Sequence, residues 1–152
     1  MSSARLQELV GTFSGTNHLW LDPEDPAELS ASTAEVTLSA RGQFLSIAYT
    51  WSKDENVQQG VVLLSTLDEA RETGSVWIDS WHMKNQIMVC EKSAFEGGVV
   101  RLSGSYAAPP GPDWGWRIEI EVQSADTWMF RMFNLWPEGR EDRAVAVEYS
   151  RT

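Results

Sequence analysis

The sequence predicts an all-β protein folded as a closed, antiparallel, up-and-down barrel of about ten strands. Two observations carry this prediction: hydrophobic residues alternate mostly with a period of two, and short polar connections separate the alternating runs. Sequential antiparallel strands leave two open edges unless the sheet closes on itself, which favours a barrel. A β-sandwich is the alternative, although its crossovers need longer connections than most of these.

Two segments give the clearest strands. From Trp116 to Gln123, apolar residues alternate with charged or polar ones, so one face of the strand is dry and the other is solvated. The run from Gln43 to Trp51 places its bulky residues on one parity in the same way. The expected inward residues are Leu45, Ile47, Tyr49, Trp51, Trp116, Ile118, Ile120 and Val122.

Other runs are rich in β-branched or aromatic residues and predict the remaining strands. They cover Phe13–Leu21, Ser32–Ser39, Val57–Leu67, Ser75–Met83, Ile87–Ala94, Val99–Tyr106, Trp128–Trp136 and Ala144–Tyr149. Breaker segments between them, such as Lys84-Asn85-Gln86 and Glu96-Gly97-Gly98, have the composition of hairpin loops. No internal repeat or domain boundary interrupts the pattern, so residues 1–152 are expected to form a single β-barrel domain.

Three segments depart from this alternation. Ala4–Val10 carries apolar residues at helical spacing, and we expect a short N-terminal helix that plugs one end of the barrel. Leu21–Leu29 is acidic and contains two prolines, which indicates a loop or lid between the first two strands. Ala107–Asp113 holds three prolines and predicts a rigid loop.

Composition and charge exclude several classes of protein. Twelve Lys and Arg residues against 22 Asp and Glu residues give a net charge of −10, which disfavours binding to nucleic acid. A hydrophobic content of 42% is too high for a disordered chain. With one cysteine, Cys90, and no long apolar segment or secretion signal, we expect a cytoplasmic protein without a disulfide or a membrane partner.

Eight tryptophans in 152 residues are the most unusual feature of the composition. A barrel of about ten strands is wider than the eight-stranded barrel that side chains just fill. The tryptophans can therefore either plug the interior or line a cavity that binds a ligand. The tryptophans to which these two roles apply are Trp51, Trp77, Trp81, Trp116 and Trp128.

The run from Trp128 to Trp136 is apolar on both parities, so both of its faces need a cover. A two-turn N-terminal helix is too small to cover a strand of this length. We therefore expect a homodimer that packs on this region.

Several polar residues are candidates for chemistry. Asp79 and His82 are three apart, which invites an acid–base role, but residues i and i+3 of a strand point to opposite faces unless a bulge intervenes. Asp79 is either hydrogen-bonded to a neighbouring strand or loop amide, or it is a polar anchor at the barrel mouth. His82 either has a hydrogen-bonded or solvent-facing imidazole, or it contacts a ligand. Arg131, in an apolar strand, is either paired with a carboxylate or free for an anionic ligand.

Motifs for catalysis and metal binding are missing from the sequence. His18, His82 and Cys90 are nearly the whole inventory of nitrogen and sulfur ligands, and no zinc spacing is present. Neither Ser14 nor Ser103 stands in the Gly-x-Ser-x-Gly motif of a hydrolase elbow. We therefore expect no metal, and no cofactor.

The segment Leu6–Thr16 resembles the start of calycin-like barrels such as the nitrobindins, where a short helix leads into a Gly-x-Trp-x-Gly strand. Over nearly its whole length, including Trp77–His82 and Gly104–Tyr106, the chain is similar to an uncharacterised bacterial family of lipocalin-like domains of unknown function. The resemblance, which extends distantly to fatty-acid-binding barrels, implies a ten-stranded barrel with a cavity for a small molecule.

The chain departs from the haem-binding relatives at three places. Phe13 replaces the Trp of the first-strand signature, Asn17 replaces a third Gly, and the last strand, Ala144–Tyr149, offers no His as a proximal iron ligand. These departures argue against haem.

Taken together, the sequence predicts a non-enzymatic binding module that takes a small, apolar or amphipathic molecule in the barrel. The expected ligand contacts are Tyr49, Trp51, Asp79, Trp81, His82, Trp116, Arg131 and Asn134. One alternative is an enzyme, an isomerase or hydrolase that uses Asp79 or His82 as an acid–base group. Another is a haem protein with His18 or His82 as the iron ligand.

Overall fold

The computed structural model of the chain describes residues 6–66 and 71–152, and these residues contain ten β-strands. The strands are β1 (Gly11–Leu19), β2 (Glu28–Ser39), β3 (Phe44–Lys53), β4 (Asn56–Ser65), β5 (Arg71–Asp79), β6 (Met88–Glu96), β7 (Val99–Tyr106), β8 (Trp114–Val122), β9 (Thr127–Leu135) and β10 (Glu141–Arg151). The sequence predicted a run near each of them, and the expected end of one run at Leu67 lies outside the described residues.

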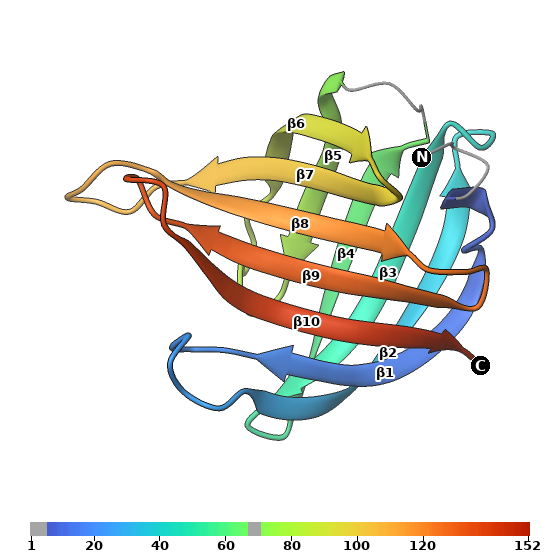
Figure 1. Cartoon of the computed structure of the whole chain (residues 1–152), viewed down its shortest axis with the longest axis horizontal. Helices are drawn as coiled ribbons and strands as arrows, with labels where there is room; N and C mark the ends of the chain where they lie inside the picture. Colours follow the sequence, from blue (N-terminus) through green and yellow to red (C-terminus); the bar gives the residue numbers. More distant parts are fainter. Residues whose placement is uncertain (1–5, 67–70) are drawn as a thin grey trace.

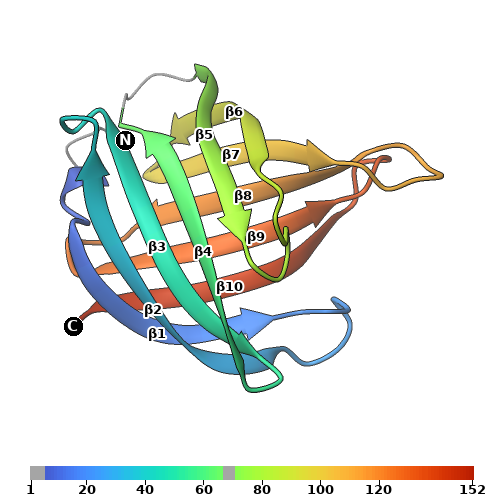
Figure 2. The same ribbon diagram turned by 180° about the vertical axis from the view of Figure 1, so that it is seen from behind.

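The ten strands form one closed barrel in which every strand pairs antiparallel with its neighbours in sequence (Figures 1 and 2). β1 and β10 close it, with Asn17 opposite Val147 and His18 opposite Ala146. The predicted barrel is therefore confirmed, and the alternative β-sandwich is wrong. Closure leaves no open sheet edge, which is the physical reason to prefer it.

The up-and-down order divides the connections between two ends of the barrel. The loops β1–β2, β3–β4, β5–β6, β7–β8 and β9–β10 share one end, which we call the pocket end. The β7–β8 and β9–β10 loops project at the left of Figure 1, while the C-terminus, at the end of β10, lies at its right. The second end, which we call the plugged end, carries the turns β2–β3, β6–β7 and β8–β9.

Alternation on β3 and β8 follows the sequence prediction. Side chains of one parity point inward and are buried, including Ile47 and Ile118, neither of which is exposed at all. The opposite parity carries polar and charged residues such as Thr50 and Arg117. Alternate burial of this kind gives the barrel its apolar core.

Aromatic rings fill the half of the interior near the plugged end. Trp128 packs edge-on against Phe13, with ring centroids 5.7 Å apart, and also contacts Phe130 and Tyr149. The Tyr149 hydroxyl lies 2.6 Å from the Ser32 hydroxyl, which satisfies both buried groups. This half of the barrel is a packed core rather than a cavity.

The plugged end is covered by a helical turn at residues 6–9, held by the Leu9 amide donating to the Leu6 carbonyl at 3.0 Å. Leu6 and Leu9 are completely buried against the core, as expected of a plug. A single turn replaces the short helix expected over Ala4–Val10, whose first residues lie outside the described chain. The described residues form no helix that could cross a bilayer.

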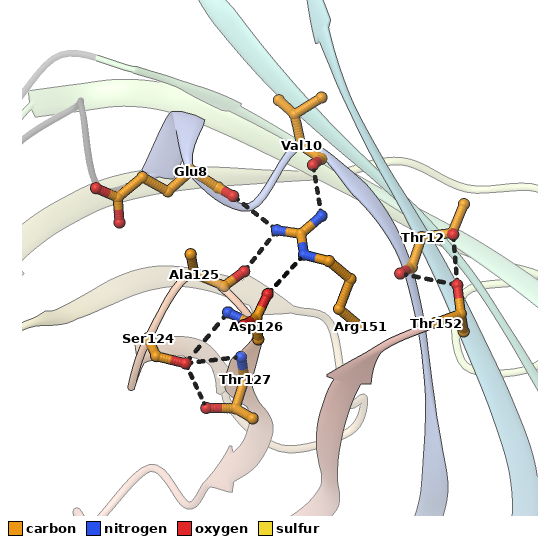
Figure 3. Close-up of polar contacts among 9 residues, drawn as sticks. All are labelled: Glu8, Val10, Thr12, Ser124, Ala125, Asp126, Thr127, Arg151 and Thr152. Atoms are coloured by element: carbon orange, nitrogen blue, oxygen red, sulfur yellow. Dashed lines mark hydrogen bonds and ion pairs between the residues drawn. The ribbon is translucent and has the colours of Figure 1, made fainter.

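Arg151, at the end of β10, ties the plug to the barrel (Figure 3). Its guanidinium donates to the backbone carbonyls of Glu8, Val10 and Ala125, and pairs with the Asp126 carboxylate at 3.1 Å. Four acceptors around one planar, five-donor group hold three segments together at once.

Candidate ligand-binding pocket

A pocket of about 470 Å³ opens at the pocket end, between β5, β6, β7 and β8. Its volume is in the range of small-molecule sites. The β5–β6 loop forms one side and the start of the β7–β8 loop forms another. The lining residues are Trp77, His82, Met83, Lys84, Asn85, Gln86, Met88, Tyr106, Ala107 and Trp116.

Three aromatic rings make the wall of this pocket. Trp77 and Trp116 lie almost parallel, at 9°, with ring centroids 5.2 Å apart, and the His82 imidazole packs against both at 5.7 and 5.5 Å. Trp77 is further fixed by a hydrogen bond from its Nε1 to the Tyr49 hydroxyl at 2.8 Å. Trp116 Nε1 has no partner within the described residues, so packing alone holds that ring.

Gly60 allows a side chain on β3 to reach a carboxylate on β5. Tyr49 pairs with Gly60 on one side, and Asp79 pairs with Gly60 on the other. Because Gly60 has no side chain, the Tyr49 ring crosses β4 and its hydroxyl donates to Asp79 Oδ2 at 2.7 Å. A β-carbon at this position would overlap the ring, so the hydrogen bond requires glycine here.

Both oxygens of the buried Asp79 carboxylate are fully used. Oδ2 accepts from the Tyr49 hydroxyl and from Trp51 Nε1 at 3.2 Å, and Oδ1 accepts from the backbone amides of Trp81 and His82, each at 2.9 Å. Asp79 therefore anchors the start of the β5–β6 loop to the barrel interior. Of the two interpretations that the sequence allowed, Asp79 follows the one in which its carboxylate is bonded to a neighbouring strand and to the loop.

The loop also overturns the expectation that Asp79 and His82 face opposite sides of one strand. β5 ends at Asp79 instead of continuing to Met83, because the Asp79 side chain draws the next backbone amides back towards itself in an Asx-type turn. His82 consequently lies on the inner side, among the rings of Trp51, Trp77, Trp81 and Trp116.

The aromatic surroundings decide the protonation of His82. Burial lowers the pKa of its imidazole below the ordinary value, and the negative charge of Asp79 opposes that shift only in part. His82 is therefore a neutral ring at neutral pH. Burial, with the nearby Asp79 carboxylate, raises the pKa of Tyr49 well above its usual range and keeps it a hydrogen-bond donor.

Polar and flexible side chains complete the rim. The Tyr106 hydroxyl donates to Asn134 Oδ1 at 2.6 Å, which orients Tyr106 at the pocket mouth. Met83 and Met88 supply adaptable apolar contacts. Lys84 is the one formally charged residue among the described residues that line the pocket.

Arg131 is not brought to this pocket. It belongs to the parity of β9 that faces outward, where it pairs with Glu121 at 2.7 Å and with Glu119 at 3.4 Å. Arg101 and Arg117 contact the same Glu119 carboxylate from β7 and from β8. The sequence left two roles open for Arg131, and the structure shows the first: its guanidinium is paired with carboxylates.

The other predicted contacts are placed as follows. Trp116 and His82 line the pocket, Asn134 lies at its rim through Tyr106, and Tyr49, Trp51, Asp79 and Trp81 form the layer behind the wall. His18 lies elsewhere, stacked on Trp20. Within residues 6–66 and 71–152, no three His, Cys, Asp or Glu side chains converge as a metal site requires. Contact of the expected residues with a ligand stays a prediction.

Residues 2–151 match DUF1579, a family of proteins of unknown function. The chain belongs to this family. The DUF1579 barrel is similar in structure to Rv2717c from M. tuberculosis, with a TM-score of 0.61 and 14% identity over 98% of this chain and 96% of that one. A DUF3598-family protein of unknown function from Nostoc punctiforme PCC 73102 gives a TM-score of 0.52 and 12% identity over 97% of this chain and 48% of that chain.

At these identities the solved structures show the fold of the DUF1579 chain and nothing finer. No curated protein matches it. The sequence resemblance is thus confirmed as membership of a family of unknown function with a ten-stranded barrel. Kinship with the nitrobindins and the fatty-acid-binding barrels stays a prediction.

The predicted ligand contacts did not include several residues that line the pocket of the DUF1579 barrel, namely Trp77, Met83, Lys84, Asn85, Gln86, Met88, Tyr106 and Ala107. Lys84-Asn85-Gln86 was interpreted only as a hairpin connection. A signal was present in Asp79-Ser80-Trp81-His82, because an Asp that begins a polar stretch often caps the amides two and three residues later. These two hydrogen bonds end β5 at Asp79 and turn the following loop over the barrel mouth.

Proposed function

We propose that this protein binds a small, largely apolar molecule at the pocket end of its barrel. One observation carries the proposal: the interior is packed with rings near the plugged end but leaves a pocket of about 470 Å³ at the other, walled by Trp77, Trp116 and His82. A concave site with apolar walls and a few polar groups at its rim is the usual form of a small-molecule site.

The polar network behind the wall supports binding rather than catalysis. Each oxygen of the Asp79 carboxylate accepts two hydrogen bonds. The carboxylate therefore has a structural role, and it directs no free lone pair at a substrate. His82 contacts rings on several sides, and among the described residues its imidazole has no hydrogen-bonded partner that could relay a proton. Preorganised aromatic walls of this kind favour affinity for flat apolar surfaces.

Titration with the neutral fluorescent probe N-phenyl-1-naphthylamine tests the proposal, using direct excitation of the probe. We expect saturable binding to the wild type. An Ala107→Trp variant, which places a large ring on the pocket lining, should weaken binding several-fold. Ser105→Trp is the matched control, because Ser105 is exposed on β7, two residues away and outside the pocket lining.

Equal affinity of the two variants would place the probe elsewhere on the protein and contradict the proposal. So would the absence of saturable binding to the wild type. A thermal shift on addition of the probe gives an independent measure, because a ligand that binds only the folded state stabilises it.

A further inference from the structure

The geometry points to a ligand that carries a negative group as well as a flat apolar body. Lys84 is the residue that would pair with the negative group. The inference rests on the proposed function and adds the chemical class of the ligand. The apolar body follows from the stacked wall of Trp77 and Trp116, together with the neutral ring of His82. The negative group follows from the charge of the rim.

Lys84 combines a place on the pocket lining with the lack of an ion-pair partner among the described residues; Lys92 is also unpaired but lies outside the pocket. By contrast, Lys53, Arg117 and Arg131 are all paired with carboxylates. Asp79, the acidic residue of the layer behind the wall, is 1% exposed, and its two carboxylate oxygens accept four hydrogen bonds. The accessible rim therefore presents one uncompensated positive charge.

The overall charge of −10 works against an anionic ligand, so the two effects must be weighed. At physiological ionic strength, exposed charges are screened beyond about 8 Å, which confines the repulsion of distant carboxylates. A cation on the pocket lining acts within that distance. The local charge consequently decides the preference inside the pocket, while the net charge lowers the rate at which anions arrive.

Neighbouring side chains suit a charged group at the same place. Asn85 and Gln86 follow Lys84 along the rim, and their side-chain amides can donate to an anionic oxygen. The apolar residues Met83 and Met88 lie on the same lining. An amphipathic molecule, with its ring on the aromatic wall and its anionic group at the loop, satisfies both sets of contacts.

Two probes with the same aromatic framework test this inference: 8-anilinonaphthalene-1-sulfonate, which is anionic, and N-phenyl-1-naphthylamine, which is neutral. Their dissociation constants are measured for the wild type, for Lys84→Gln and for Lys92→Gln. Lys92 is exposed on β6 outside the pocket, so the second variant makes the same change in net charge without touching the rim.

We expect Lys84→Gln to weaken binding of the sulfonate by about two- to fivefold, the range that exposed ion pairs give, and to leave the neutral probe unchanged. Lys92→Gln should change neither constant. Added salt should weaken sulfonate binding in the wild type more than in Lys84→Gln.

Each result separates the two proposals. If the neutral probe binds in the pocket but Lys84→Gln does not weaken the sulfonate, or weakens it no more than Lys92→Gln does, the charge inference is wrong and the binding function stands. The same holds if the sulfonate fails to bind. If neither probe binds the wild type, the proposed function fails and this inference fails with it.

Discussion

Gly60 on β4 lies directly opposite Tyr49 on β3, and the Tyr49 ring occupies the space where a side chain at position 60 would stand. The same glycine also pairs with Asp79 on β5. This one missing side chain lets a tyrosine span three strands and hold the carboxylate that anchors the pocket loop. The pocket thus depends on a residue that does not touch it.

Gly60→Ala tests this relationship. We expect the variant to lose about 1–3 kcal/mol of unfolding free energy, because the new methyl group overpacks the Tyr49 ring and displaces its hydroxyl from Asp79. Urea denaturation monitored by fluorescence measures the change. Gly111→Ala is the control, since a β-carbon there meets only an ordinary van der Waals contact; an equal loss in the control contradicts the explanation.

Asp79→Asn tests the anchor itself. An amide has the same shape as the carboxylate but turns an N–H group towards one pair of donors, so about 1–3 kcal/mol of stability should be lost and probe binding should weaken as the loop loosens. Asp142→Asn is the comparison, because Asp142 also accepts from an indole, that of Trp136, but lies outside the pocket lining. Unchanged probe affinity in Asp79→Asn would refute the anchoring role.

His82 should make stability depend on pH. Its pKa is lowered in the folded state, so the unfolded chain binds the proton more readily. The contribution of neutral His82 to the unfolding free energy is complete above about pH 6.5, the pKa of a histidine in the unfolded chain. It is lost as the pH falls through the lower pKa of His82 in the folded state. Urea denaturation at pH 7.5 and at pH 5.5, taken as about one unit either side of that value, should show a decrease that His82→Gln reduces and His18→Gln preserves. An identical decrease in all three proteins contradicts the assignment.

The period-two alternation was enough to predict the barrel, because β3 and β8 each bury one face and most of the described connections are short. The side on which Arg131 lies could not be predicted, since β9 is apolar on both parities and the carboxylates that pair with it come from β8. Alternation is equally silent about the end of β5, which a hydrogen bond from the backbone decides. The Tyr49–Gly60–Asp79 alignment depends on register between strands, and no local pattern reports it.

The outer face of β9 bears on the expected homodimer. Phe133 lies under the Arg117 guanidinium, 4.6 Å from its ring centroid, so the chain covers part of this face itself. A dimer through the remaining surface stays a prediction. Light scattering at micromolar concentration tests it, and the expected mass is twice that of the monomer. Phe133→Glu should dissociate such a dimer, and Val89→Glu, on the exposed face of β6, should not. A monomeric mass for the wild type removes the idea.

The most direct test of ligand binding in the barrel mouth is the indole N–H region of a ¹H–¹⁵N spectrum during titration with N-phenyl-1-naphthylamine. The resonances of Trp77 and Trp116, which line the pocket, should shift and saturate together, while that of Trp128, which lies outside the pocket lining in the packed half, should stay in place. Binding that leaves Trp77 and Trp116 unmoved, or that shifts only Trp20 and Trp136 outside the pocket lining, would contradict the account.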